Sequence, residues 1–399
     1  MKAMVRWWRL AGALAWLALA ACATRVELPE TRFQQVRDVS RAISLEVAKR
    51  FSSPIPGLTL PQGLGLTKPL LLGGFPQAST AEAMVSGHHL RDLLLLDLRQ
   101  TMPDTAVARL EEAGDLPSAL MLHGVVSYLP GTSTENESSW FKIAYAVRTY
   151  PDADVLLSGS ALVNARHFDA TPTRFYKDAP IYFASEQQKE LVALASAESG
   201  DAGMQRAMRR SLAYESARGA YEREQYEVAA RRFEEILEQG DSEDLLALSG
   251  RFQSLWQLAR KDEAEQVFGR LIDVAIARDA LSIKFLFAVQ QDDFDRRSPL
   301  YQQYPMWIRQ VARGMLASRL CFEIKGHSSR SGTAAYNDAL STARARRVMR
   351  YMTAAEPELA SRVRAKGYGF RQNIIGSGSD DAGDAIDRRV DFAEVGCPA

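Results

Sequence analysis

The chain has 399 residues, with 49 basic and 49 acidic side chains. Its first 21 residues carry three basic and no acidic side chains, so their removal would leave a net charge of −3. This balance argues against nucleic-acid binding, which usually needs a basic surface. A chain of this length predicts two or three domains.

The first residues are typical of a secretory signal peptide. Lys2, Arg6 and Arg9 form a basic region, and an apolar run from Leu10 to Ala21 follows. The run is too short to span a bilayer, which takes roughly 20 apolar residues. Its length and its basic start are those of a cleaved leader.

A cysteine follows the predicted leader, residues 1–21, directly. The leader ends in Leu-Ala-Ala before Cys22, which resembles the lipobox of bacterial lipoproteins. The resemblance implies cleavage before Cys22 and acylation, including palmitate, and two or more acyl chains anchor a protein stably. Because Ala23 and not aspartate follows, the chain is similar to lipoproteins sorted to the outer membrane, with the body in the periplasm. An ordinary signal peptide with a chance cysteine is the alternative.

Two further cysteines, Cys321 and Cys397, are present. In an oxidising periplasm an isolated pair tends to form a disulfide. Cys321 lies in a strand-like stretch (319–326) and Cys397 follows another (387–395), so antiparallel pairing of the two would permit the bridge. Two unpaired thiols are the alternative. The five histidines are not at metal-ligand spacings, and we expect neither a metal nor a cofactor.

Residues 22–185 are predicted to form an α/β domain. An amphipathic helix over 30–51 precedes a buried strand over 68–75, and a leucine-rich helix over 87–102 follows. Three strands come next, and their short connections predict an antiparallel meander. These strands are expected over 119–129, 140–150 and 154–166.

This order of elements resembles the periplasmic domains of the FlgO, CsgG and LpoB lipoproteins. The resemblance is carried by the strand over 68–75, the helix after it and the strand pair over 145–163. No short motif accompanies it. An unrelated α/β domain is the alternative.

Residues 186–280 are predicted to be helical and contain a repeat. The stretches 220–237 and 255–272 align with a shift of 35 residues, which matches Ala229 with Ala264. This resembles tetratricopeptide repeats, whose period is about 34. A repeat groove implies a partner, here an unknown envelope protein, while a plain helical spacer is the alternative.

Residues 281–399 predict a β-α-β-α-β-β order. The six elements are expected over 281–290, 304–318, 319–326, 337–354, 362–370 and 387–395. This segment resembles the OmpA-like peptidoglycan-binding domain of outer-membrane proteins and of the lipoprotein Pal. The resemblance is carried by the spacing of Gly326-His327, Leu340-Ser341, Gly367-Tyr368-Gly369 and Arg388-Arg389. The whole chain is therefore predicted to be a multidomain α+β protein.

The OmpA-like resemblance implies a ligand, the diaminopimelate of the wall stem peptide. It places Arg344 against the ligand carboxylate, which a guanidinium pairs bidentately. The family aspartate that pairs the ligand ammonium is replaced by Ser329 here. Loss of a charged hydrogen bond of about 1.5–3 kcal/mol weakens binding roughly 10- to 150-fold. Asn337, Leu340 and Arg388 are the other expected peptidoglycan contacts.

Three interpretations of this domain stay open. It binds the wall weakly, or Asp338 turns inward as a substitute acid, or the fold serves protein interaction without wall affinity. For the whole chain we expect a non-catalytic outer-membrane lipoprotein that tethers or scaffolds in the cell envelope. The alternative is an accessory or activator factor of a wall synthase, secretion apparatus or flagellum. A glycoside hydrolase would need a carboxylate pair flanking a cleft, and no sequence pattern predicts one.

Overall fold

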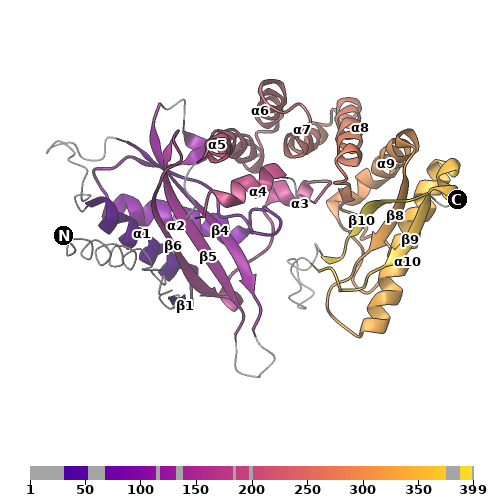
Figure 1. Cartoon of the computed structure of the whole chain (residues 1–399), viewed down its shortest axis with the longest axis horizontal. Helices are drawn as coiled ribbons and strands as arrows, with labels where there is room; N and C mark the ends of the chain where they lie inside the picture. The colour runs from indigo at the N-terminus through magenta and orange to yellow at the C-terminus, as the bar shows by residue number, and fades with distance from the viewer. Residues whose placement is uncertain are drawn as a thin grey trace, which may run out of the picture. The chain divides into compact units, whose positions relative to one another are not determined.

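Helices and strands both contribute to the fold, which is mixed α+β as predicted (Figure 1). The computed structural model describes residues 31–52, 68–113, 117–131, 138–182, 186–196, 201–373 and 387–397. Residues 32–399 group into one compact unit. The predicted leader and Cys22 lie outside the described residues.

The first sheet has six strands in the order β1-β6-β5-β4-β2-β3, and Figure 1 labels four of them, β1, β6, β5 and β4. Its three long strands, β4, β5 and β6, form the predicted antiparallel meander. In contrast, β2 pairs in parallel with both β3 and β4. The bounds are β1 Arg32–Phe33, β2 Leu70–Leu72, β3 Val107–Arg109, β4 Ala119–Leu129, β5 Trp140–Tyr150 and β6 Val155–Asn164. The strand predicted over 68–75 is shorter than expected, and Gly73 follows its last residue.

Both faces of the first sheet are covered by other elements. Because side chains alternate along a strand, neighbouring residues of β4 enter different cores. In β4, Leu120 and Leu122 join a core with the helices α1 (Val36–Ser52) and α2 (Val85–Thr101). Their neighbours Ala119 and Met121 point the other way, into a smaller core with residues of α5. Coverage on both faces explains why β4 is an almost continuous apolar run at its start.

Five helices follow the short helix α3 (Arg174–Asp178). They are α4 Glu186–Ala193, α5 Ala202–Glu222, α6 Tyr226–Gln239, α7 Leu245–Gln257 and α8 Lys261–Ala277. The turns after α5 and α7 share one backbone geometry. Glu224 and Ala259 both adopt positive φ, 61° and 59°, and these positions are 35 residues apart. The shift in the sequence pattern therefore corresponds to a repeated helix-turn-helix in the structure.

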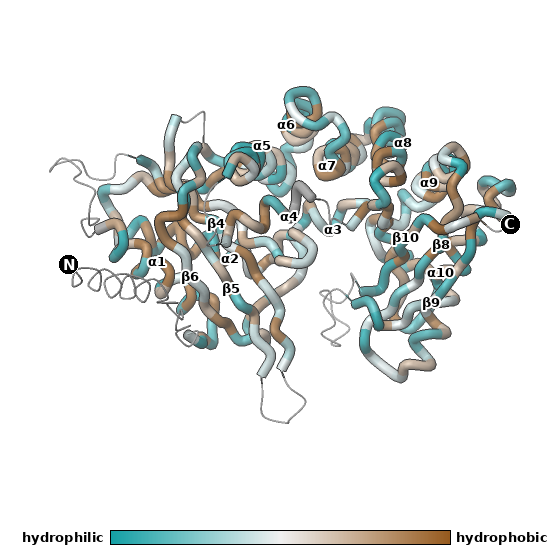
Figure 2. The backbone as a smooth tube through the Cα atoms, in the orientation of Figure 1, coloured by the Kyte–Doolittle hydropathy of each residue, from teal (hydrophilic) through white to brown (hydrophobic). Residues whose placement is uncertain are grey.

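Small and aromatic residues make the close contacts within this repeat. Phe233 of α6 and Phe268 of α8 occupy matching positions, and both are fully buried. Phe233 packs onto Gly250 of α7, where a Cβ atom would lie 2.4 Å from the ring. In Figure 2, α7 is coloured largely as hydrophobic, in line with the burial of Leu246 and Phe252.

The second sheet has four strands in the order β7-β10-β8-β9. Along the chain, β7, α9, β8, α10, β9 and β10 follow the predicted β-α-β-α-β-β order. The bounds are β7 Ser282–Ile283, α9 Tyr304–Ser318, β8 Cys321–Gly326, α10 Ala334–Ala355, β9 Val363–Gly367 and β10 Val390–Val395. The strand β8 runs parallel to β9 and antiparallel to β10.

The strand predicted over 281–290 is only two residues long. After Ile283 the chain turns away from β10, because Lys284 is held by another part of the molecule. Its backbone N–H donates to the carbonyl of Pro180, and its ammonium lies 3.0 Å from the carboxylate of Glu82. The following residues then fold back on themselves as a hairpin.

Candidate functional site

Cys321 and Cys397 form a disulfide, with their Cα atoms 5.2 Å apart. Cys321 begins β8 and lies opposite Val395, the last residue of β10. The antiparallel pairing that the sequence required is therefore present. The predicted bridge therefore joins β8 to the chain after β10 at the start of β8, and the candidate loop follows the other end of β8.

The loop after β8 is shaped by a close helix crossing. Gly326 ends the strand where α10 passes over it, and a Cβ atom there would lie 1.9 Å from the carbonyl oxygen of Ser341. Only glycine permits this approach. The helix α10 begins after Thr333, whose hydroxyl accepts a hydrogen bond from the backbone N–H of Tyr336 at 3.3 Å. Such an N-terminal cap stabilises a helix start.

His327 follows Gly326 and is completely buried. Its Nε2 lies 3.1 Å from the carboxylate of Asp391 in β10. Burial lowers the pKa of His327, so the ring is neutral near pH 7. Burial alone would raise the pKa of Asp391, but the contacts with His327 and Arg389 lower it to about 2. This histidine therefore fixes the loop to the sheet.

Arg344, the predicted carboxylate partner, lies on α10 with 1% of its surface exposed. Its guanidinium donates to three main-chain carbonyls, those of Gln291 at 3.1 Å, His327 at 3.3 Å and Ala288 at 3.4 Å. It also lies 5.1 Å from the ring centre of Phe287. A carboxylate from outside would have to replace these contacts.

The residues over Arg344 form a hairpin, residues 287–294, which we name the cap hairpin. Phe287 pairs with Phe294, and the N–H of Ala288 donates to the carbonyl of Asp293 at 2.9 Å. The helix α10 also binds its tip through Arg347, which pairs with Asp292 at 3.0 Å and with Asp293 at 2.8 Å. Arg344 and Arg347, one turn apart on α10, thus bind main-chain carbonyls and side-chain carboxylates of the cap hairpin.

The other predicted contacts surround the same loop. Ser329 and Asn337 are buried, and the Asn337 amide donates to the carbonyls of Ser331 at 2.7 Å and Thr333 at 3.1 Å. Leu340 and Arg388 are half-buried. The structure therefore places Ser329 in the loop before α10, Asn337 in the first turns of the helix and Arg344 near its middle, while their contact with a ligand stays a prediction.

Asp338 does not turn inward in this structure. Its carboxylate lies 2.7 Å from the guanidinium of Arg371, and both side chains are about half exposed. In this structure Asp338 therefore does not take the place of the family acid that Ser329 replaces.

Residues 300–386 match the model of the OmpA family. They form an OmpA-family domain. Among solved structures, the OmpA-family domain is similar to the peptidoglycan-associated lipoprotein of Burkholderia pseudomallei, at 23% identity over 29% of this chain and 90% of that one, with a TM-score of 0.25. The C-terminal domain of Helicobacter pylori MotB matches at 16% identity over 28% of this chain and 83% of that one, with a TM-score of 0.24.

The OmpA-like domain of FopA1 from Francisella tularensis is also similar, at 23% identity over 29% of this chain and 70% of that one, with a TM-score of 0.22. These likenesses are low, and the family assignment rests on the match of residues 300–386. No curated protein matches the chain. None of the described helices is long and apolar enough to cross a membrane. The described residues also contain no group of three or more His, Cys, Asp or Glu side chains arranged to hold a metal ion.

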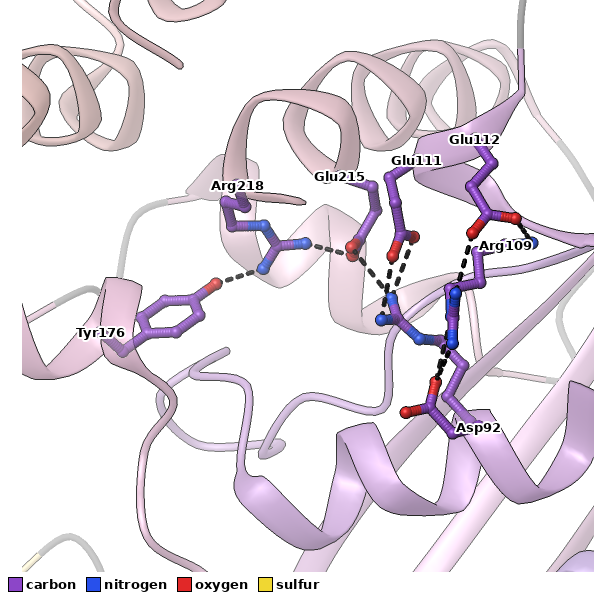
Figure 3. Close-up of polar contacts among 8 residues, drawn as sticks. Asp92, Arg109, Glu111, Glu112, Tyr176, Glu215 and Arg218 are labelled. Carbon is purple, nitrogen blue, oxygen red and sulfur yellow. Dashed lines mark hydrogen bonds and ion pairs between the residues drawn. The ribbon is translucent and has the colours of Figure 1, made fainter. Parts of the chain in front are cut away.

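A second cluster of charged side chains lies outside the OmpA-family domain, and Figure 3 shows its contacts. Arg91 of α2 pairs with Glu111 at 3.0 Å and with Glu215 of α5 at 3.7 Å. Arg218, one turn further along α5, contacts both Glu215 and the hydroxyl of Tyr176 in α3. A cavity of about 230 Å³ adjoins the cluster.

The charges in this cluster balance, two guanidiniums against two carboxylates. Burial raises the pKa of Glu111. Burial would also raise the pKa of Glu215, but the charges of Arg218 and Arg91 lower it overall. The cluster therefore joins α2 and α5 through buried ion pairs, with no excess charge to attract a ligand. No sequence motif marks these residues, since the residues of α5 lie more than a hundred positions from Arg91 and Glu111 and this separation leaves no local signal.

His123 of β4 lies near this cluster. We expect it to make the stability of the folded protein sensitive to acid. The ring is buried against Gly73, and burial lowers its pKa to about 4, with smaller effects from Glu215 and Arg148. The unfolded chain takes up this proton near pH 6.5, so stability is lost as pH falls from 6.5 towards 4. At pH 4.5 the loss should be about 2–3 kcal/mol.

Urea unfolding of the wild type and of His123→Gln at pH 7 and pH 4.5 measures this loss. The variant should show a smaller drop in the free energy of unfolding between the two pH values. His89→Gln, at an exposed position of α2, is the matched control and should keep the wild-type drop. An unchanged drop in His123→Gln would show that other groups cause the acid sensitivity.

Proposed function

We propose that this protein is a non-catalytic outer-membrane lipoprotein that associates with peptidoglycan through its OmpA-family domain. The observation that carries the proposal is the family match over residues 300–386. A similar solved structure is named as a peptidoglycan-associated lipoprotein, and the lipobox-like sequence at Cys22 supports the same location. The domain would hold the wall, while the acyl chains on Cys22 would hold the membrane.

The arrangement around Arg344 favours weak association with the wall. The expected acid is a serine at position 329, and the guanidinium of Arg344 is bound to carbonyls of its own chain. Both features remove attraction for a zwitterionic amino acid. A ligand must therefore displace the cap hairpin or bind elsewhere on the domain.

Co-sedimentation with purified sacculi tests the proposal. The full chain should pellet with sacculi at low salt, and the pelleted fraction should fall as salt screens the charges. Soluble wall tripeptide in excess should compete, whereas the same tripeptide without diaminopimelate should compete less. Recovery of the whole protein in the supernatant at low salt would refute wall binding.

An accessory role in an envelope machine is the second candidate. It is favoured by the repeated helix-turn-helix, whose turns at Glu224 and Ala259 share one geometry. Stacked helical repeats present extended surfaces on which partner proteins bind. Crosslinking in cells separates the two candidates, because mainly wall fragments support the first and one abundant protein partner supports the second.

A further inference from the structure

An open cleft lies beside the loop that precedes α10. One wall consists of residues 77–79 together with the end of β4 and the residues after it. The other wall consists of Arg330 and residues 370–373, which follow β9. The cleft has a volume of about 580 Å³. Ligand-binding pockets of proteins typically measure about 300–1,000 Å³.

The charge of this cleft is positive. Its lining includes two guanidiniums, those of Arg330 and Arg371, and no carboxylate among the described lining residues. Arg371 is paired with Asp338. Arg330 is exposed and makes no hydrogen bond or ion pair with any residue in the described part of the chain. An unpaired guanidinium in a concave site is suited to an anion, and its planar fork suits a carboxylate in particular.

The rest of the lining provides both apolar and polar surface. Phe370, Tyr128 and Pro130 contribute apolar surface to the lining, and Ser79 and Ser127 add hydroxyl groups. The segment at 77–79 is held to β4, because the N–H of Ala78 donates to the carbonyl of Val126 at 2.8 Å. This wall is therefore an ordered extension of the first sheet. A peptide with aliphatic and carboxylate groups matches such a surface.

The contrast between Arg330 and Arg344 indicates which guanidinium is available. Arg344 is enclosed by the cap hairpin and donates to three carbonyls, whereas Arg330 lies in the loop before α10 and lines the cleft. We infer that the cleft is a binding site for a carboxylate of the peptidoglycan stem peptide, held by Arg330. This inference rests on the proposed function. It places the contact with the stem-peptide carboxylate at Arg330, in a cleft that is also lined by the end of β4, instead of at Arg344.

Sacculus co-sedimentation of the full chain tests the inference with two variants. Arg330→Ala should weaken retention about 10- to 150-fold, since it removes a charged hydrogen bond. Ser79→Trp should also weaken it, by filling the cleft from the opposite wall. Arg346→Ala is the matched control, because Arg346 is an exposed arginine of α10 that does not line the cleft. Thermal unfolding checks that each variant is folded.

The outcomes separate this inference from the proposed function. Loss of retention in Arg330→Ala and Ser79→Trp, with full retention of Arg346→Ala, supports the cleft. Equal retention of Arg330→Ala and the wild type overturns the cleft while the proposed function stands, and so does an equal loss in Arg330→Ala and Arg346→Ala. A wild-type chain that fails to pellet overturns the proposed function and this inference with it.

Discussion

Replacement of Lys284 with methionine should lower the free energy of unfolding by about 3–5 kcal/mol. Lys284 and Glu82 are 202 positions apart in the sequence, and both are at least 95% buried. The ammonium lies 3.0 Å from the Glu82 carboxylate and also donates to the carbonyl of Tyr176. The ring of Tyr182 lies 4.9 Å from it. Removal of the cation leaves a carboxylate buried without its partner, which must then be protonated or hydrated.

Urea unfolding followed by far-ultraviolet circular dichroism measures this loss. The double variant Glu82→Gln/Lys284→Met should recover most of the stability, because it removes both charges. Arg297→Met is the matched control, since it removes a cation from a surface pair with Asp295 and should change stability by less than about 1 kcal/mol. Equal effects of Lys284→Met and Arg297→Met would contradict the buried-pair interpretation.

Loss of the disulfide should be nearly as costly, at about 2–5 kcal/mol. Cys321 and Cys397 are 76 positions apart, so the bridge removes much of the freedom of the unfolded OmpA-family domain. The double variant Cys321→Ala/Cys397→Ala should therefore unfold at lower urea concentration than the wild type.

A reductant provides an independent test of the same bridge. It should destabilise the wild type by the same amount and leave the double variant unchanged. Cys22→Ala is the matched control, because it removes a cysteine outside the described fold and should unfold like the wild type. A wild type that is insensitive to reductant would argue against the bridge.

The two predictions concern opposite ends of β10 in the second sheet. Lys284 follows β7, which pairs with β10 on one side and contacts residues 180–182 on the other. The disulfide joins the far ends of β8 and β10. The loop before α10 is therefore held by a sheet that is fixed at two places, which suits a binding site built on a rigid scaffold.

Local patterns were enough to predict most helices and strands. The predicted strands over 119–129 and 140–150 coincide with β4 and β5, and the helix over 304–318 coincides with α9. The two strands are largely apolar runs next to turns that contain proline, and the helix has apolar residues at helical spacing, so nearby residues decide their conformation. The strand over 281–290 is wrong over most of its length, because the contact of Lys284 with Glu82 outweighs local strand preference.

The OmpA-like order of elements and the position of Arg344 on its helix were predictable from the sequence alone, whereas the pairing of Cys321 with Cys397 was predicted only on the condition that their strands run antiparallel. These features depend on spacing along the chain, which a pattern records directly. No local pattern shows that the cap hairpin encloses Arg344 or that Arg330 lines an open cleft, because both depend on how distant segments pack. A charged side chain binds whichever oxygen the fold brings within reach, and two of the three carbonyls that bind Arg344 come from residues more than fifty positions away.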